Sequence, residues 1–220
     1  MYGRAVPRRD PFGAGVVFAM VPAIVLAAGG SSRMGWPKAL LPIGRDTFLS
    51  RILRTLAEAN ADDLLVVIGP DAARIEASLA GLDLAVRLIE NPAWERGQLS
   101  SLQAGLLAAD RPGVRGVLVT LVDLPLVSAA TVRQVLEAYR RNPSVPIVRP
   151  VRDQRHGHPV VLGRALFEEL RAADPAAGAR PVIQAHLHAA VDVPVTDEGA
   201  FLDIDTRDDY ERLIGPWPGG

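Results

Sequence analysis

The sequence has 220 residues with a formal net charge of −1; 49% of the residues are hydrophobic, 22% are charged and none is cysteine. The near-neutral charge, without basic runs, argues against nucleic acid as the main partner, and the lack of cysteine excludes disulfides, thiolate zinc sites and a cysteine nucleophile. The length fits one α/β domain with a sizeable core. Lys38 is the only lysine among 24 basic residues, which draws attention to its surroundings.

The first residues, 1–19, are rich in proline, glycine and arginine, and they predict a disordered extension in front of a single domain at 20–220, with Met20 as a candidate natural start. The uncharged stretch Pro11–Ser32 superficially resembles a signal peptide or a membrane span. Its glycines and Pro22 disfavour a spanning helix. We therefore expect a soluble cytoplasmic protein without a membrane partner.

From about residue 23 the chain alternates short apolar runs with amphipathic stretches. The apolar runs are continuous, which is typical of strands buried on both faces of a parallel sheet. The predicted strands of the first half are Ile24–Ala27, Leu64–Ile68, Leu84–Ile89 and Val114–Val122. The predicted helices are Thr47–Asn60, a helix capped by Asp71 that ends near Leu79, Leu99–Ala109, and a helix capped by Ser128 that ends near Arg140.

The second half of the chain is less regular. Strands are predicted at Val145–Val148, Pro159–Leu162, Val191–Val195 and Phe201–Leu202, and helices at Arg164–Ala172, Pro181–Leu187 and Thr206–Leu213. No repeat, coiled coil or long linker divides the sequence. Together the elements predict a three-layer α/β/α fold, Rossmann-like, with a mostly parallel sheet and helices on both faces.

A loop of unusual composition, AGGSSRMGWPK (Ala28–Lys38), follows the first strand, and ligands of such folds bind beyond the carboxyl ends of the strands. Its glycines let backbone N–H groups approach an anion. Arg33 and Lys38 can neutralise a polyphosphate, and Ser31 and Ser32 add hydroxyl donors. The loop matches neither the Rossmann G-x-G-x-x-G pattern nor the P-loop. The retained lysine and the nearby arginine favour phosphate binding over an ordinary strand-to-helix connection.

The segment LAAGGSSRMGWPKALLPIG (Leu26–Gly44) resembles the signature of the MobA-like nucleotidyltransferases, and within that group it most resembles the molybdenum cofactor cytidylyltransferase type. Further segments fall in the family's order: NPAWERGQLSSLQAGL (Asn91–Leu106), LVDLP (Leu121–Pro125), GHPVVLGRALFEEL (Gly157–Leu170), GAR (Gly178–Arg180) and DIDTRDDY (Asp203–Tyr210). The resemblance implies a fold of the nucleotidyltransferase type. It also implies transfer of a nucleotide from an NTP to a phosphorylated acceptor, with Mg²⁺ and release of pyrophosphate.

Asp123 follows the most apolar predicted strand, a position that projects a carboxylate into a site at this sheet edge. Because Ser128 is the better placed cap for the next helix, metal ligation by Asp123 is favoured over capping. Mg²⁺ usually takes one or two protein carboxylates. The resemblance points to Asp203 as the second ligand, with Asp205 close behind, and the other of these two is expected to cap the helix that follows.

The resemblance also indicates nucleotide contacts in two segments. In the segment Gly97–Ser101, Gly97 allows close backbone approach and the serines begin a helix whose N–H groups point at the ligand. Ser101 is the expected contact, and capping of that helix by Ser100 is the alternative for this segment. The expected contacts of the first segment are Leu26, Ala27, Ala28, Gly29, Gly30, Ser31, Ser32 and Gly35.

His158 and Arg180 match the family segments near the acceptor and are expected to meet its phosphate. For His158 the alternative is a turn with a partly buried histidine. A histidine-ligated metal is disfavoured, because His186 and His188 lie two residues apart on a predicted helix and would diverge.

We expect Arg33 and Lys38 to bind the triphosphate and stabilise the leaving pyrophosphate, with Asp123 as the third catalytic residue. The opening Leu-Ala-Ala-Gly, rather than Leu-Ala-Gly-Gly, favours CTP over GTP by resemblance, so that CMP passes to the terminal phosphate of a molybdopterin-type cofactor. The alternatives are GTP, another acceptor such as a sugar phosphate or methylerythritol phosphate, and a non-catalytic nucleotide-binding maturation factor. A molybdenum hydroxylase that receives the product is the implied protein partner.

Overall fold

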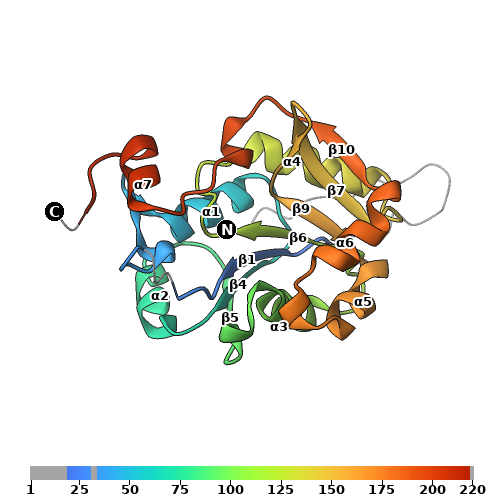
Figure 1. Cartoon of the computed structure of the whole chain (residues 1–220), viewed down its shortest axis with the longest axis horizontal. Coiled ribbons are helices and arrows are strands. Elements are labelled where there is room, and N and C mark those ends of the chain that lie inside the picture. The colour runs from blue at the N-terminus through green and yellow to red at the C-terminus, as the bar shows by residue number, and fades with distance from the viewer. Residues whose placement is uncertain (1–18, 31–33, 219–220) are drawn as a thin grey trace, which may run out of the picture.

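A computed structural model describes residues 19–30 and 34–218 of the chain (Figure 1). Its centre is an eight-stranded sheet with the order β10-β7-β9-β6-β1-β4-β5, in which β8 pairs with β7. The strands of this sheet are β1 (Ala23–Ala27), β4 (Leu64–Ile68), β5 (Val86–Glu90), β6 (Gly116–Leu121), β7 (Ile147–Arg152), β8 (Arg155–His156), β9 (Val160–Gly163) and β10 (Val191–Pro194). A separate antiparallel ribbon joins β2 (Pro42–Ile43) to β3 (Asp46–Thr47).

The first half of the chain forms the parallel part of the sheet. Strand β1 pairs with β4 on one side and with β6 on the other, and β4 pairs with β5, all in parallel. Both β1 and β4 are buried along their whole length, because helices cover both faces of the sheet. This confirms the interpretation of continuous apolar runs as central parallel strands.

The second half makes the sheet mixed. Strand β9 runs antiparallel to both β6 and β7, whereas β10 is parallel to β7. Strands β7 and β8 form a hairpin that turns through Asp153 and Gln154, at φ of 48° and 62°. Positive φ at both central residues matches the twist of a tight two-residue hairpin. Strand β8 was not predicted, since Arg155–His156 carries no apolar signal.

Helices on both faces complete three layers (Figure 1). One apolar cluster joins α1, α2 and α4 to one face of the sheet, and a second cluster joins α3, α5 and α6 to the other face. Along β1, Val25 packs in the first cluster and Ile24 in the second, as the alternation of side chains on a strand requires. The helices are α1 (Phe48–Glu58), α2 (Ala72–Leu79), α3 (Gln98–Ala109), α4 (Ala129–Arg141), α5 (Phe167–Ala172), α6 (Arg180–His186) and α7 (Arg207–Leu213).

Local capping chemistry explains where several helices begin. The Ser128 hydroxyl accepts from the backbone N–H of Thr131 at the start of α4, as predicted. Thr206 and Asp209 form a reciprocal capping box at the start of α7. The expectation that Asp203 or Asp205 caps this helix is therefore wrong, because Thr206 itself is the N-cap and satisfies the free N–H groups.

Two other local predictions need correction. Asp71 is the N-cap of α2, but its side chain makes no capping bond and pairs instead with Arg74 at 3.3 Å. The predicted strand Phe201–Leu202 is wrong. Phe201 ends a 3₁₀ turn, Glu198–Phe201, in which the N–H of Gly199 donates to the Asp197 carboxylate. A bond from a side chain to the backbone has outweighed the strand preference of the apolar residues here.

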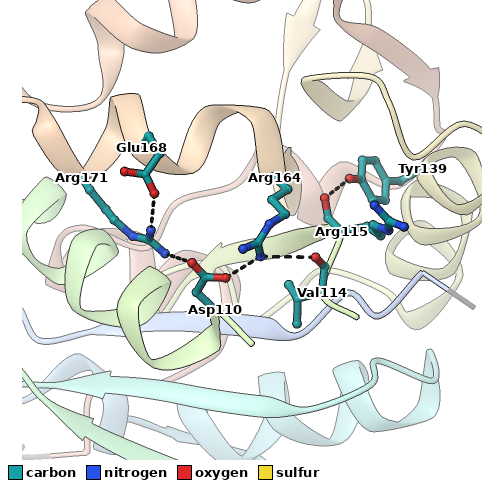
Figure 2. A network of polar contacts seen from close by, with 7 residues as sticks. All are labelled: Asp110, Val114, Arg115, Tyr139, Arg164, Glu168 and Arg171. Atoms are coloured by element: carbon teal, nitrogen blue, oxygen red, sulfur yellow. Dashed lines mark hydrogen bonds and ion pairs between the residues drawn. The ribbon is translucent and has the colours of Figure 1, made fainter. Parts of the chain in front are cut away.

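A polar network connects the parallel first half of the fold to the second half (Figure 2). It lies near the start of β6, whereas Asp123 follows the end of this strand. Asp110, just after α3, accepts from both Arg164 and Arg171, and Arg171 also contacts Glu168 at 2.8 Å. Nearby, the buried Tyr139 hydroxyl donates to the carbonyl of Arg115, which precedes β6. Within residues 19–30 and 34–218, no helix has both the length and the apolar character needed to cross a bilayer.

Candidate functional site

A cavity of about 400 Å³ opens at the carboxyl ends of β1 and β6. The loop after β1, the segment between β5 and α3, and the end of β6 form its walls. This is the edge where ligands bind in open α/β sheets, and β1 lies at the point where the chain passes from one side of the sheet to the other. The residues that line this first cavity are Leu26, Ala28, Gly29, Gly30, Met34, Lys38, Trp94, Glu95, Gly97, Gln98, Ser101, Leu121, Val122, Asp123 and Asp205.

The glycine-containing loop contributes backbone to the first cavity. A Cβ on Gly29 would meet nothing within 4 Å among the described residues, whereas a Cβ on Gly30 would lie 3.0 Å from the Trp94 ring. The indole packs directly on the loop at Gly30, where a larger residue would make a tight contact with the ring. Gly35 takes a φ of 62° in the turn that precedes the lysine and lies outside the cavity lining.

Several predicted loop residues are not placed in the first cavity. Ala27 is the last residue of β1 and is buried in the core. Ser31, Ser32 and Arg33 lie outside the described residues. Their roles remain predictions.

Lys38 lies between two of the predicted metal ligands. Its Nζ is 2.5 Å from Oδ1 of Asp205 and 3.4 Å from Oδ2 of Asp123. A 3₁₀ turn, Lys38–Leu40, begins at this lysine and directs it to the cavity. The single lysine side chain of the protein thus lies beside two carboxylates, and it is only 14% exposed.

The Asp123 carboxylate has an unsatisfied oxygen. Within the described part of the chain, its buried Oδ1 has no hydrogen-bond partner, while Oδ2 faces Lys38. A buried acceptor without a partner costs free energy, and a divalent cation at Oδ1 would remove that cost. The Asp123 backbone carbonyl accepts from the N–H of Ile204 at 2.9 Å, which fixes the acidic C-terminal segment beside the end of β6.

Asp203 and Asp205 flank Ile204 and bring further negative charge to the site. Although Asp203 reaches solvent, partial burial and then the nearby Asp123 and Asp205 carboxylates raise its pKa. Among the described residues, no group of three His, Cys, Asp or Glu residues is tight enough to hold a metal by itself. Mg²⁺ and similar hard cations usually take one or two carboxylates together with phosphate oxygens. This donor set therefore fits a cation that arrives with a nucleotide.

A small apolar cluster holds these elements together. Met34 and Leu41 pack with Phe48, Ile204 and Tyr210. The Tyr210 hydroxyl also donates to the carbonyl of Pro42 at 2.7 Å. Through this cluster, α7 brings the acidic C-terminal segment against the chain on both sides of Lys38.

The segment after β5 forms another wall of the first cavity. Gly97 takes a φ of 100° as the N-cap of α3, and Ser101 lines the cavity. Ser100 is buried and donates to the carbonyls of Ala93 and Gly97. Capping of α3 by the Ser100 side chain is therefore wrong, since this hydroxyl closes the preceding turn instead. The Asn91 amide donates to both serine hydroxyls and holds them in place.

His158 lies in a second cavity, of about 280 Å³, which shares Leu26, Gln98 and Leu121 with the first. The His158 Nδ1 lies 3.3 Å from the carbonyl of Val119. Burial lowers the His158 pKa, so the neutral imidazole is favoured at pH 7. Arg180 is the first residue of α6; it is exposed and lies outside the lining of both cavities. Its neighbour Ala179 lines the second cavity together with His158, and the role of Arg180 stays a prediction.

Sequence reasoning missed several residues of the first cavity. Trp94 and Glu95 lie between β5 and α3, and Gln98 is the first residue of α3. Their signal is positional, because they follow a parallel strand at its carboxyl end. The contact between Trp94 and Gly30 joins segments far apart in the chain, so no local pattern in the sequence indicates it.

Comparisons with known proteins match most of the chain. A profile described as the MobA-like NTP transferase domain matches residues 23–191. A protein named nicotine blue oxidoreductase, from Paenarthrobacter nicotinovorans, is 30% identical over 200 residues, which cover 88% of this chain and 96% of the relative. A probable molybdenum cofactor guanylyltransferase from Opitutus terrae is 35% identical over 120 residues, or 53% of this chain and 54% of that protein.

The fold is similar to crystal structures of Rv0371c from Mycobacterium tuberculosis. One of them matches with a TM-score of 0.75 and 31% identity, and it covers 90% of this chain and 98% of that one. A second, in complex with manganese, matches with a TM-score of 0.72 and 29% identity over 90% of this chain and 99% of that one.

Proposed function

The chain belongs to the MobA-like NTP transferase family, and on that premise we propose that it transfers CMP from CTP to the terminal phosphate of a molybdopterin-type cofactor and releases pyrophosphate. The observation that carries the proposal is the arrangement around Asp123. A buried carboxylate oxygen without a partner among the described residues, the single lysine and a second carboxylate meet at one end of a cavity whose other wall is a glycine loop.

The residues of the first cavity suit this chemistry. Asp123, with Asp203 or Asp205, would hold a divalent cation such as Mg²⁺. When bound, that cation would neutralise negative charge on the phosphates. Lys38 would neutralise the triphosphate, and Arg33, outside the described residues, is proposed to do the same. The backbone of Gly29 and Gly30 would face the phosphates, and Gly97 and Ser101 the remainder of the nucleotide.

The bond changes need no general base from the protein. An oxygen of the acceptor phosphate forms a bond to the α-phosphorus, the bond from that phosphorus to the bridging oxygen breaks, and pyrophosphate leaves with the electron pair. A phosphate monoester is already ionised at neutral pH, so no proton has to be removed before attack. The task of the protein is to position both phosphates and neutralise their charge.

Activity measurements with different nucleotides and acceptors decide which substrates the protein uses. The Leu-Ala-Ala-Gly opening favours CTP, while a relative of this chain is named as a guanylyltransferase. The purified protein should be incubated with each NTP, Mg²⁺ or Mn²⁺, and a molybdopterin, sugar phosphate or methylerythritol phosphate acceptor, with pyrophosphate as the readout. Release with GTP alone would overturn the CTP assignment. No release with any pair would favour a non-catalytic nucleotide-binding role.

Asp123→Asn tests the observation on which the proposal rests. The variant keeps the size of the side chain but loses its charge, so we expect turnover to fall by at least about 100-fold while the far-UV circular dichroism is unchanged. Asp208→Asn is the matched control, since this exposed residue on α7 lies near the site in sequence but makes no described contact with it. Full activity of Asp123→Asn would refute the metal-binding role.

A further inference from the structure

Lys38 brings a positive charge to the carboxylates that are proposed to hold the divalent cation. Its Nζ lies 2.5 Å from Oδ1 of Asp205 and 3.4 Å from Oδ2 of Asp123. Because the lysine side chain is largely buried, solvent screens these two ion pairs less than it screens pairs on the open surface. The ammonium group therefore compensates charge on both carboxylates without a metal ion.

Backbone and core contacts hold the two carboxylates close together. The N–H of Ile204 donates to the carbonyl of Asp123 at 2.9 Å, and the Ile204 side chain is fully buried beside Met34 and Phe48. Asp205 follows Ile204 directly in the chain. The carboxylates of Asp123 and Asp205 therefore cannot move far apart to relieve their repulsion, and a positive charge between them is favourable even when no nucleotide is bound.

The ammonium group and a divalent cation compete for these carboxylates. A cation held by Asp123 and Asp205 would draw on the charge that Lys38 already neutralises, and two positive charges at such short range repel each other. Within the described part of the chain, Oδ1 of Asp123 has no partner, but it belongs to the same carboxylate that faces Lys38. The lysine thus lowers the affinity of the carboxylates for a cation that arrives alone.

The position of Lys38 also allows it to leave the carboxylates. Its side chain lines the first cavity together with Gly29 and Gly30, whose backbone is proposed to face the phosphates. A lysine is a compact charge on a flexible four-carbon chain, so it can turn from one partner to another. A bound triphosphate would attract the ammonium group, and its oxygens would add ligands for the cation at the carboxylates that Lys38 has left.

We infer that Lys38 excludes a divalent cation from Asp123 and Asp205 until a triphosphate draws the ammonium group away, so that cation and nucleotide bind together. The identity of the ligand that moves Lys38 rests on the proposed function. The exclusion itself is a property of the protein without nucleotide, and it can be measured without turnover.

Binding of Mn²⁺ to the full chain without nucleotide tests the exclusion, with free Mn²⁺ measured by electron paramagnetic resonance. We expect a Kd above about 1 mM for the unmodified protein. Lys38→Met removes the charge and keeps an unbranched side chain, so it should bind Mn²⁺ at least about tenfold more tightly. Unchanged or weaker binding by the folded variant would overturn the inference. A Kd of about 0.1 mM or less for the unmodified protein would also overturn it, and this measurement needs no variant.

Three further variants locate the effect. Arg51→Met removes a positive charge at an exposed position of α1 and should leave Mn²⁺ binding unchanged, so it controls for net charge. The double variant Lys38→Met/Asp123→Asn should lose the gain in affinity; a gain that persists would place the Mn²⁺ elsewhere and overturn the inference. Lys38→Gln gives the same test with a neutral polar side chain if Lys38→Met fails to fold.

Tripolyphosphate tests the release of Lys38 without dependence on the base of the nucleotide. The ammonium group has to leave the carboxylates only in the unmodified protein. The factor by which tripolyphosphate tightens Mn²⁺ binding, corrected for Mn²⁺ that it binds in solution, should therefore be larger for the unmodified protein than for Lys38→Met. An equal or smaller factor would contradict the exchange of partners.

These outcomes are distinct from those that test the proposed function. A gain in Mn²⁺ affinity that depends on Asp123, combined with no pyrophosphate release for any NTP and acceptor, would support the role of Lys38 and refute the transferase proposal. Pyrophosphate release by the unmodified protein, without any gain in Mn²⁺ affinity in Lys38→Met, would support the transferase and refute the exclusion.

Discussion

At the residue scale, Lys38 forms ion pairs with two carboxylates in addition to its proposed contact with phosphate. Its ammonium group contacts Asp205 and Asp123 at the position where a divalent cation is expected. A compact ammonium on a flexible chain can reach both carboxylates, whereas a planar guanidinium presents its donors in a fixed fork. This difference gives a physical reason for one lysine in a chain whose other basic residues are arginines.

Lys38→Arg keeps the charge and changes its geometry. We expect turnover to fall by about tenfold or more, because the larger group cannot reproduce both contacts. The rate of pyrophosphate release is the measurement. The reverse exchange at an exposed site of α1, Arg51→Lys, should leave the rate unchanged. A silent Lys38→Arg substitution would mean that only the charge matters at this position.

A second prediction at this scale concerns the contact between Gly30 and Trp94. Gly30→Ala places a methyl group 3.0 Å from the indole, so the loop or the indole must shift, and we expect the Kd for CTP to rise about tenfold. Gly81→Ala is the matched control, because this exposed glycine lies outside the first cavity and its Cβ would meet nothing within 4 Å among the described residues. The smaller ring in Gly30→Ala/Trp94→Phe should restore part of the affinity. Equal effects of the two glycine substitutions would contradict this explanation.

At the scale of elements, short C-terminal segments place the acidic residues. The 3₁₀ turn Glu198–Phe201 and helix α7 lie on either side of Asp203 and Asp205. Asp197 anchors the first of these segments, since its carboxylate accepts from the backbone N–H groups of Ser128 and Gly199. The start of α4 is thereby connected to the chain that leads into the site.

Asp197 predicts a dependence of stability on pH. Burial alone would raise its pKa, but the hydrogen bonds from Ser128, Thr131 and Gly199 outweigh burial and lower it below 3.8. The carboxylate therefore contributes stability above the unfolded-state pKa, and this contribution is lost as the pH falls through the lower folded-state pKa.

In urea unfolding at pH 7, Asp197→Asn should lower the free energy of unfolding by about 1–2 kcal/mol. The difference from the unmodified protein should shrink as the pH falls below 3.8. Asp83→Asn, at an exposed position, should show neither effect. A difference that grows toward acid pH would contradict the predicted sign.

At the scale of the whole molecule, the first cavity and the Asp110 network lie at opposite ends of the sheet. The first cavity lies beyond the carboxyl ends of β1 and β6, whereas the Asp110 network lies near the start of β6 (Figure 2). That network connects α3 to α5, and so joins the parallel half of the fold to the part that contains the antiparallel strand β9.

Asp110→Ala tests this separation. A hydrogen bond from Arg171, followed by one from Arg164, lowers the pKa of Asp110 against the effect of burial. Because these ion pairs are close to solvent, we expect their loss to cost only about 1 kcal/mol of the free energy of unfolding. The Kd for CTP should stay within about twofold, since the network is remote from the first cavity. A large change in Kd with normal stability would show that the two ends are coupled.

Local sequence patterns, such as apolar runs and capping residues, predicted much of the first half of the chain, which forms the parallel part of the sheet. Leu64–Ile68 was predicted with the observed bounds, because an unbroken apolar run bounded by polar residues and glycine leaves little choice. Ser128 was correctly predicted to cap α4, since capping involves residues only three positions apart. The second half was less predictable, because the antiparallel direction of β9 depends on pairing with β6 and β7, which are distant in the sequence.

The sequence by itself determined the family resemblance, the strand–helix alternation and the residue types of the site. The glycine loop and Asp123 follow the two central strands β1 and β6, and parallel pairing places strand ends together. Only the tertiary structure decided that Asp205 meets Lys38, that Trp94 packs on Gly30, and that His158 lies in the second cavity beside the Val119 carbonyl. Local signals extend over a few residues, whereas these contacts depend on packing between segments far apart in the chain.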